Sequence, residues 1–243
     1  MLVIIVPFRA TNQPERREHL TIFLNVMPVL LPSAKIIIAE QEDDGALFNI
    51  GLLMNICFLQ SNIKDTDTVC IHHVDLIPHE NIILEYTKVL PPKTMRHIGS
   101  AWTRYQKKHF CTGVILMHAS DFRAVNGFPN DMWGWGGEDV ILGRRIKARN
   151  IQVERCTGII HDQENMKTVH EKFQHLKDTK ALGKNLFKRM RWYRQDENLY
   201  LRGLRQVPCY STEQVVKGSI LRVLVSFETS QHASKCMSAI RNP

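Results

Sequence analysis

The sequence predicts an α/β fold in which a central, mostly parallel sheet is flanked by helices. Short apolar runs alternate with amphipathic segments along most of the chain, as is typical of a sheet covered on both faces. The 243 residues, of which 44% are hydrophobic and 23% charged, suffice for one large domain with a substantial core. No apolar run approaches the roughly 18 residues of a membrane-spanning helix, so no transmembrane segment is expected.

The first half of the chain supplies three strands and two helices. Leu20, Phe23 and Met27 fall on one helical stripe, and Pro32 ends that helix because proline cannot continue it. We expect strands at residues 2–6, 36–39 and 69–71, and helices at residues 15–31 and 46–59.

The second half continues the alternation. Glu138 and Asp139 place negative charge in the first turn of a helix, where the helix dipole favours it, and Ser120 is suited to cap a short helix. We see no internal repeat or clear linker, so residues 1–228 are predicted to form a single domain and the polar residues 229–243 a frayed C-terminal tail. We expect strands at residues 96–99, 113–118, 151–155 and 220–227, and helices at residues 120–125, 138–149 and 164–176.

Basic residues gather late in a chain whose net charge is +8. Such a cluster suits phosphate, an anionic glycan, a membrane surface or nucleic acid, or it is simply a solvated helix face. No nucleic-acid recognition motif accompanies it, so nucleic acid is not expected as a partner. The cluster comprises Lys184, Lys188, Arg189, Arg191, Arg194, Arg202 and Arg205.

Several common motifs are absent. The six cysteines form no CxxC pair, which argues against a structural zinc site, and most lie in apolar runs typical of reduced, buried thiols. The chain also lacks GxGxxG, GxxxxGK[ST] and GxSxG sequences. Dinucleotide binding, P-loop chemistry and hydrolysis by a serine elbow therefore lack their usual sequence signatures.

Residues 125–139 are the most informative segment. Trp133 and Trp135 lie among four glycines, and Glu138 and Asp139 follow at once. Glycine lets the backbone approach a ligand closely, and tryptophan offers a flat apolar face and one N–H donor. A carboxylate beside such a platform is suited to accept a proton from a bound hydroxyl. The alternative is a glycine-rich turn with two core tryptophans.

Asp75 and His161 are candidate ligands of a divalent cation. Each follows an apolar, strand-like run, and in open α/β sheets ligands bind beyond the carboxyl ends of strands. A mixed carboxylate and imidazole site suits manganese better than calcium. The alternatives are that Asp75 caps the turn before Pro78 and that His161 is a surface histidine.

Four blocks, taken in order, resemble the β-1,4-galactosyltransferases of the GT-A type. The fourth block is highly specific, and the four together span about residues 7 to 161. The blocks are Pro7-Phe8-Arg9 with Arg17-Glu18-His19-Leu20, Phe48-Asn49 with residues 52–56, Val74-Asp75-Leu76-Ile77-Pro78, and residues 126–130 with 133–139.

The resemblance implies a Rossmann-like GT-A fold and an inverting transfer of a hexose, most simply galactose, from a UDP-sugar to a glycan hydroxyl, with Mn²⁺ as cofactor. It implies that Asp139 is the general base and that Asp75 and His161 bind the metal. A glycine-rich loop before Trp135 would close over the donor. The implied donor-binding residues are Pro7, Phe8, Arg9, Phe48, Asn49, Val74, Asp75, Trp135 and His161, and the implied acceptor-binding residues are Trp135, Gly137, Glu138 and Asp139.

The chain departs from the family pattern mainly on the donor side. His73 stands where the first aspartate of Asp-x-Asp usually lies, Ile50 replaces an arginine, and Gly158 replaces a metal-binding methionine of some members. Phe110 aligns near the position that tunes donor choice.

Two alternatives to a galactosyltransferase stay open. One is an N-acetylgalactosaminyl- or glucosyltransferase on the same scaffold, for example one that builds a glycosaminoglycan-like chain, since the basic cluster would suit an anionic acceptor. The other is a glycan-binding protein with a degenerate transferase site. The cellular compartment is also open, because the sequence shows no signal or anchor whereas members of the family often act in the Golgi lumen.

Overall fold

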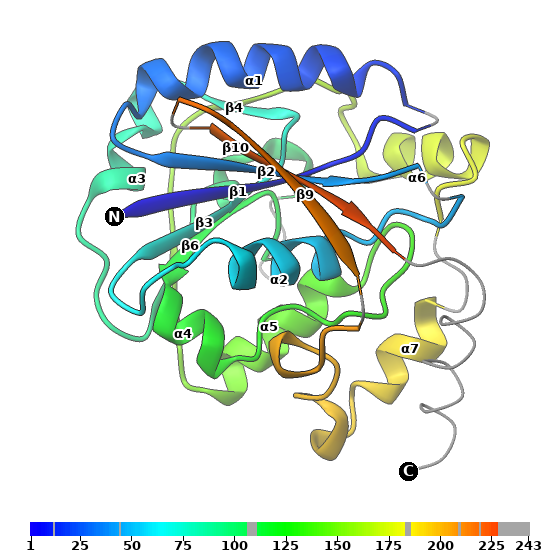
Figure 1. Ribbon diagram of the computed structural model, residues 1–243. Helices are drawn as coiled ribbons and strands as arrows, with labels where there is room; N and C mark the ends of the chain where they lie inside the picture. Colours follow the sequence, from blue (N-terminus) through cyan, green and yellow to red (C-terminus); the bar gives the residue numbers. More distant parts are fainter. Residues whose placement is uncertain are drawn as a thin grey trace.

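The computed structural model describes residues 1–11, 13–43, 45–105, 111–182, 186–208, 210–218 and 220–227. An eight-stranded sheet with the order β7-β5-β6-β3-β1-β2-β10-β9 runs through the molecule, and helices lie on both of its faces (Figure 1). Strand β1 pairs in parallel with β2 and β3, β2 with β10, and β5 with β7, whereas β6 and β9 run antiparallel to their neighbours. The prediction of a mostly parallel sheet flanked by helices is confirmed.

The strands are β1 Leu2–Phe8, β2 Lys35–Gln41, β3 Thr68–His72, β4 Leu76–Pro78, β5 Thr94–His97, β6 Val114–His118, β7 Gln152–Arg155, β8 Ile160–Asp162, β9 Ser211–Lys217 and β10 Ile220–Ser226. The helices are α1 Arg16–Leu30, α2 Ile50–Gln60, α3 Leu84–Thr87, α4 Ala119–Ala124, α5 Glu138–Ala148, α6 Val169–Asp178 and α7 Leu186–Trp192. The expected C-terminal tail and Phe110 lie outside the described residues.

Alternation along the central strands divides the interior into two cores. Successive side chains of a strand point to opposite faces of its sheet, so Val3 and Ile5 pack on the face covered by α2, α4 and α5. Ile4 and Val6 pack on the opposite face, against α1. Because both faces are buried, the central strands read as continuous apolar runs rather than as alternating ones.

Several helices begin at other residues than predicted, because capping residues set their first turn. Helix α2 begins at Ile50 instead of residue 46, because the Asn49 side chain caps it by accepting from the backbone N–H of Leu52 at 3.0 Å. Helix α6 begins at Val169 instead of residue 164, because Thr168 caps it. The prediction that Ser120 caps α4 is wrong, since that helix begins one residue earlier and His118 occupies the cap position.

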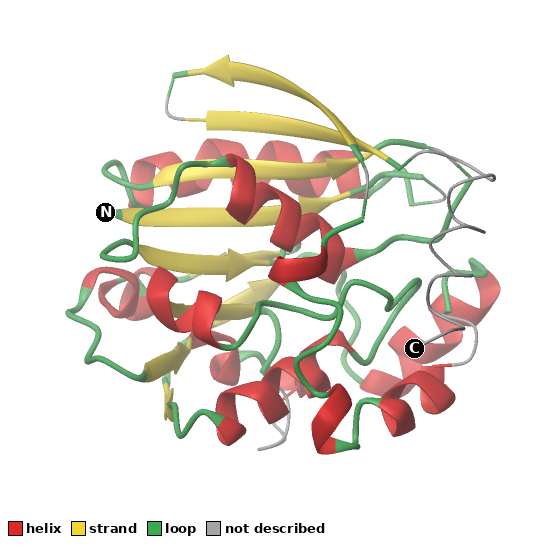
Figure 2. Cartoon of the chain, turned by 60° about the horizontal axis from the view of Figure 1, so that its bottom comes forward, coloured by secondary structure: helices red, strands yellow, loops and turns green. Residues whose placement is uncertain are grey.

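Five helices and strands were not predicted: helices α3 and α7, the edge strand β9, and strands β4 and β8, which form a small antiparallel sheet. Figure 2 shows β9 and β10 as a hairpin at one edge of the large sheet. Strand β9 is exposed along most of its length, so the sequence carries little of the apolar signal that marks a buried strand.

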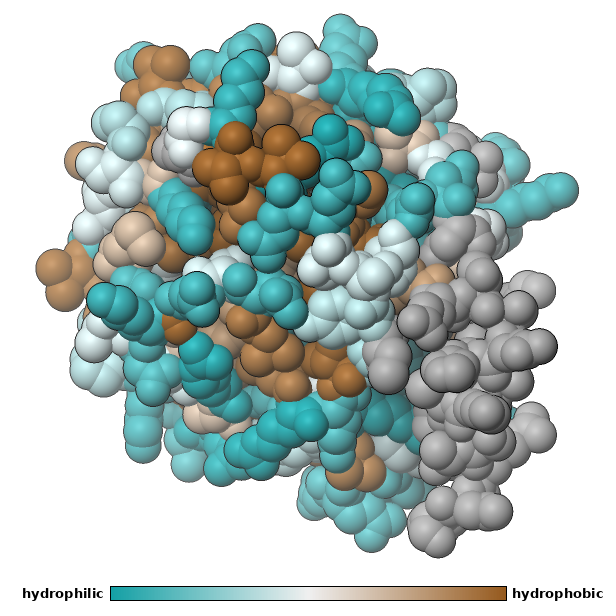
Figure 3. Space-filling view, in the orientation of Figure 1, coloured by the Kyte–Doolittle hydropathy of each residue, from teal (hydrophilic) through white to brown (hydrophobic). Residues whose placement is uncertain are grey.

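The surface is mixed in character. In Figure 3, patches of hydrophobic residues lie among hydrophilic ones, one of them over the β9–β10 region, and Val216 of β9 is 71% exposed. None of the described helices combines the length and the apolar character needed to cross a bilayer. The expectation of reduced thiols is confirmed for the four cysteines within the described residues, which are free and buried: Cys57, Cys70, Cys111 and Cys156.

Candidate active site

A cavity of about 330 Å³ opens at the carboxyl ends of the central parallel strands. Residues just after β1 and β3 line it, together with the loop before α2, the glycine–tryptophan segment, and helices α5, α6 and α7. This edge of the sheet is the usual place for a ligand in an open α/β fold. The lining includes eight residues expected at the site: Pro7, Arg9, Phe48, Asp75, Trp135, Gly137, Glu138 and Asp139.

The asparagine-rich blocks of the sequence hold the glycine–tryptophan segment in place. The Asn55 amide donates to the Phe128 carbonyl at 2.8 Å and accepts from the Phe128 N–H at 3.0 Å. Gly127 has a φ of +59°, and a Cβ there would come within 2.3 Å of the Asn55 amide oxygen, so only glycine fits. The Asn49 amide also donates to the Asn130 carbonyl at 2.8 Å. Asparagine side chains of the second block thus hold the backbone of the fourth block in place.

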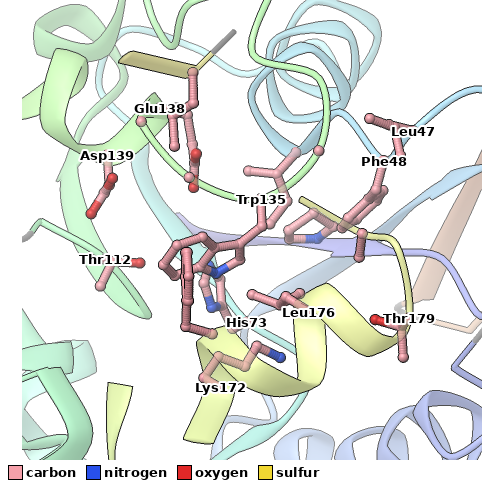
Figure 4. Close-up of a pocket in the computed structure, with 18 of the residues that line it drawn as sticks. Leu47, Phe48, His73, Thr112, Trp135, Glu138, Asp139, Lys172, Leu176 and Thr179 are labelled. Carbon is pink, nitrogen blue, oxygen red and sulfur yellow. The ribbon is translucent and has the colours of Figure 1, made fainter. Parts of the chain in front are cut away.

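Trp135 lies in the middle of the cavity, between the carboxylates of α5 and the side chains of α6 (Figure 4). Its backbone N–H donates to the Ala181 carbonyl at 3.0 Å, and its ring meets Phe173 edge-on at 6.3 Å. One residue earlier, the Gly134 N–H donates to the Phe48 carbonyl at 2.8 Å. The segment is therefore held to both walls of the cavity.

Glu138 and Asp139 open helix α5 beside the indole ring. Gly137 precedes them with a φ of +97°, and a Cβ at that position would lie 2.7 Å from Leu186. Burial raises the pKa of Asp139 above its usual range. Burial and the neighbouring Asp139 charge raise the pKa of Glu138 further. As the pH rises, Asp139 therefore loses its proton at a lower pH than Glu138 does.

A second group of carboxylates lies on the other side of the cavity. One oxygen each from Asp75, Asp162 and Glu164 lie within 4.8 Å of one another. Burial alone would raise the pKa of Asp75, but nearby positive charge brings it below its ordinary value. Asp75 is therefore an ionised, buried carboxylate. The groups that lower the pKa of Asp75 are His73, when its imidazole is protonated, Arg16 and Lys172.

Two buried cations already pair with the other members of this group. Arg104 forms ion pairs with Asp162 and with Glu164, the latter at 2.7 Å. Lys172 of α6 pairs with Glu164 at 2.5 Å. These pairs tie α6 to the turn after β8, and among the described residues Asp75 takes part in no such ion pair.

Two guanidinium groups line the end of the cavity near α1. Arg9 is 7% exposed and donates to the Ala46 carbonyl at 2.5 Å. Arg16 lies 5.9 Å above the Phe48 ring. Within the described part of the chain, the Nε atoms of both arginines are buried without a hydrogen-bond partner, so both retain a donor for an anionic ligand.

Four of the expected residues lie outside the cavity lining. Phe8 and Val74 belong to the hydrophobic core on the α1 face, and Asn49 is fully buried as the cap of α2. His161 is exposed and its ring faces His79 at 5.9 Å. His161 pairs with Ile77 across the β4–β8 sheet, and its neighbour Asp162 is the residue brought to Asp75.

Sequence reasoning missed Arg16, Arg104, Asp162, Glu164 and Lys172. The acidic residues at alternate positions after a strand-like run were a usable signal, because alternate residues of a strand share one face. The three cations carried no local signal, since they come from distant segments. His73 and Ile50, the two departures from the family pattern, both line the cavity.

The chain is similar to two known protein-family models and to several curated proteins. Residues 1–87 match the N-terminal region of glycosyl transferase group 7, and residues 94–172 match the N-terminal domain of galactosyltransferase. Human β-1,4-galactosyltransferase 7 is 33% identical over 186 residues, which cover 74% of this chain and 54% of that protein. Human β-1,4-galactosyltransferase 1 is 33% identical over 180 residues, or 67% and 42% of the two chains. The chain thus spans about half the length of the curated relatives it matches.

A solved structure shares the whole fold. The catalytic domain of Drosophila β-1,4-galactosyltransferase 7 in complex with xylobiose superposes with a TM-score of 0.65, at 22% identity, over 96% of this chain and 97% of that one. A mutant of the Drosophila enzyme, in complex with manganese, UDP-Gal and xylobiose, superposes equally well. With the two family matches and the relatives at 33% identity, the chain belongs to the β-1,4-galactosyltransferase family.

Proposed function

We propose that residues 1–228 form one catalytic domain that transfers galactose from UDP-galactose to a glycan hydroxyl, with Mn²⁺ and with inversion at the anomeric carbon. The observation that carries this proposal is the pairing, in one cavity, of an unpaired carboxylate at the start of α5 with the acidic group around Asp75. The relatives named above are galactosyltransferases, and the Drosophila structure holds manganese and UDP-Gal. A sheet-edge cavity of this size also suits a nucleotide sugar.

Asp139 is the proposed general base. It takes the proton from the acceptor hydroxyl as that oxygen attacks the anomeric carbon, and the bond from that carbon to UDP breaks in the same displacement. Its raised pKa suits the task, because a base works best when its pKa approaches the operating pH. Glu138, which keeps its proton longer, is suited to donate a hydrogen bond to the acceptor.

The donor set around Asp75 fits a divalent cation. Its three carboxylates offer only oxygen atoms, which manganese and magnesium accept readily. We assign the ion to Asp75 with Asp162 and Glu164, in place of His161. When bound, the ion would neutralise charge that develops on the departing diphosphate. Arg104 and Lys172 already share Asp162 and Glu164, so binding requires these ion pairs to rearrange.

The remaining lining residues are proposed to bind the donor and acceptor. Arg9 and Arg16 present buried, unpartnered Nε donors suited to the diphosphate. Pro7 and Phe48 supply the apolar wall beside them. Trp135 lies between Phe48 on one side and Glu138 and Asp139 on the other (Figure 4), so its ring is suited to contact both the donor sugar and the acceptor sugar.

The test is transfer of galactose from UDP-galactose to a panel of glycans with Mn²⁺ present. Asp139→Asn removes the base without changing the size of the side chain, and we expect a fall in rate of about 10²- to 10⁴-fold with UDP binding retained. The exposed Glu197 provides the matched control, because Glu197→Gln removes a carboxylate that does not line the cavity. Equal rates for wild type and Asp139→Asn would remove Asp139 from the mechanism.

The same assay distinguishes the donor sugars. His73 and Ile50, where this chain departs from the family pattern, both line the cavity. The donor panel should therefore also include UDP-N-acetylgalactosamine and UDP-glucose. Preferred turnover of either would replace galactose in the proposal and leave the role of Asp139 intact. Lack of turnover with every donor, together with no rise in melting temperature on addition of UDP and Mn²⁺, would favour a glycan-binding protein.

A further inference from the structure

Helix α7 carries an aromatic ring and a guanidinium on one exposed face at the mouth of the cavity. Phe187 lines the cavity and yet is 81% exposed, which is unusual for so large an apolar side chain. Arg191 follows four residues later and is also exposed. Residues four apart are neighbours on a helix surface, so the ring and the guanidinium lie side by side.

The position of α7 is fixed by the adjacent face of the helix. Leu186 and Met190 lie against Gly137, since a Cβ there would come within 2.7 Å and 3.3 Å of them. Beyond the helix, the Tyr193 hydroxyl donates to the Asp131 carboxylate at 2.6 Å, and Arg202 pairs with Asp131 at 2.8 Å. The face with Phe187 is therefore held next to the segment proposed to bind the acceptor.

The charge around this face is positive. Lys180 is exposed and lines the cavity. Within the described part of the chain, neither Lys180 nor Arg191 forms an ion pair, whereas Arg189 on the same helix pairs with Asp131 at 3.5 Å. The charge of Arg189 is therefore balanced by Asp131 within the protein, whereas Lys180 and Arg191 can pair with an anionic ligand.

We propose that Phe187, Arg191 and Lys180 form a subsite for the second sugar of the acceptor, and that this sugar carries a carboxylate or a sulfate. The proposal rests on the proposed function, because the acceptor's first sugar is taken to occupy the space beside Glu138 and Asp139. The second sugar then lies outside the cavity mouth, where the exposed Phe187 ring offers a face for stacking. Its anionic group accepts charge-assisted hydrogen bonds from Arg191, and Lys180 adds positive charge at the cavity lining.

The direct test measures binding, without catalysis, of two synthetic disaccharides by isothermal titration calorimetry. Both have xylose at the non-reducing end, followed by glucuronate in one and glucose in the other. At low salt we expect glucuronate to improve the dissociation constant up to about fivefold, the effect of an exposed ion pair, and about 0.5 M salt to remove the preference. Equal affinities at low salt, or no binding of either disaccharide, would overturn the proposal.

Variants of α7 assign the effect to this face. Arg191→Gln should abolish the preference for glucuronate and leave binding of the neutral disaccharide unchanged. Phe187→Ala should weaken both disaccharides roughly three- to tenfold through lost stacking. Lys217→Gln is the matched control, because Lys217 is exposed on β9, pairs with the start of β10, and does not line the cavity. An equal loss of the preference with Lys217→Gln and with Arg191→Gln would show that the preference depends only on net charge, and would overturn the subsite.

Failure of the subsite and failure of the proposed function are distinguishable. Transfer of galactose to both disaccharides at equal efficiency would preserve the proposed function and refute the subsite. Tighter binding of the glucuronate disaccharide, sensitive to Arg191→Gln and without transfer from any UDP-sugar, would support an anionic glycan site while refuting the transferase.

Discussion

One cavity contains two groups of acidic residues that differ in how their charge is balanced. Asp139 and Glu138 have no ion-pair partner among the described residues, so burial raises the pKa of each. The group around Asp75 is surrounded by Arg104, Lys172 and other positive groups, and the pKa of Asp75 is lowered. The first group is suited to exchange a proton, and the second to hold constant negative charge. Similar residue types thus acquire different roles from their neighbours.

This difference makes the two groups respond differently to mutation. Removing a cation from the second group leaves buried negative charge unpaired, which is costly. Removing a carboxylate from the first group relieves a burial cost.

The largest effect is expected for Arg104→Gln. The Arg104 side chain is 1% exposed and pairs with two carboxylates, so its loss should lower the free energy of unfolding by about 3–5 kcal/mol, measured by urea denaturation. Added Mn²⁺ should recover more stability in this variant than in wild type, because the ion replaces the missing cation. An equal or smaller effect of Mn²⁺ would contradict the assignment of the metal to this group.

The second-largest effect is expected for Asp75→Asn. The variant keeps the side chain's size but removes the ionised carboxylate proposed to bind the metal, so we expect a fall in transfer rate of about a hundredfold or more. Mn²⁺ binding, followed by electron paramagnetic resonance, should weaken in parallel. Asp65→Asn serves as the control on an exposed residue. Unchanged Mn²⁺ affinity in Asp75→Asn would remove Asp75 from the metal site.

The pH dependence of transfer should report the first group. The base must be ionised, so kcat/KM should rise with pH and level off above the pKa of Asp139. Because burial raises that pKa, the rising limb should lie above the ordinary aspartate value of about 4, with about a tenfold loss per pH unit below it. A rising limb at the ordinary aspartate value, with Mn²⁺ and UDP-galactose saturating throughout, would contradict the assignment of Asp139 as the base.

The smallest effect is a gain in stability for Asp139→Asn. The folded protein binds the Asp139 proton more tightly than the unfolded chain, so stability from this group is full below about pH 4 and is lost as pH rises through the folded pKa. At about pH 8 the variant should therefore exceed wild type by roughly 1–2 kcal/mol. Differential scanning calorimetry at this pH and at about pH 4 provides the comparison, and no gain is expected at the lower pH.

Much of the fold could be predicted because its central strands are buried on both faces. Runs such as Leu2–Val6 and Ile36–Ala39 read as strands without any knowledge of their partners. Boundaries set by a single cap, as at Asn49 and Thr168, were less predictable, because apolar spacing continues past the cap. The exposed strand β9 was missed for want of an apolar pattern.

The candidate site likewise has a part that the sequence predicts and a part that depends on tertiary contacts. Asp139, Glu138 and Trp135 lie in one contiguous segment whose unusual composition marks it, and the cavity contains all three. The carboxylate group proposed to bind the metal joins Asp75 to residues nearly ninety positions later through the β4–β8 sheet. Its register decides that Asp162, and not His161, meets Asp75, since a shift of one residue exchanges the two faces of a strand.

The sequence by itself determined the α/β architecture, the family, and the segment that contains the proposed base. These rest on local periodicity and on contiguous motifs, which no distant contact has to supply. Only the tertiary structure decided the charge balance of the cavity and the place of α7 at its mouth. Both depend on side chains brought together from distant parts of the chain, and a pKa is set by such neighbours and by burial.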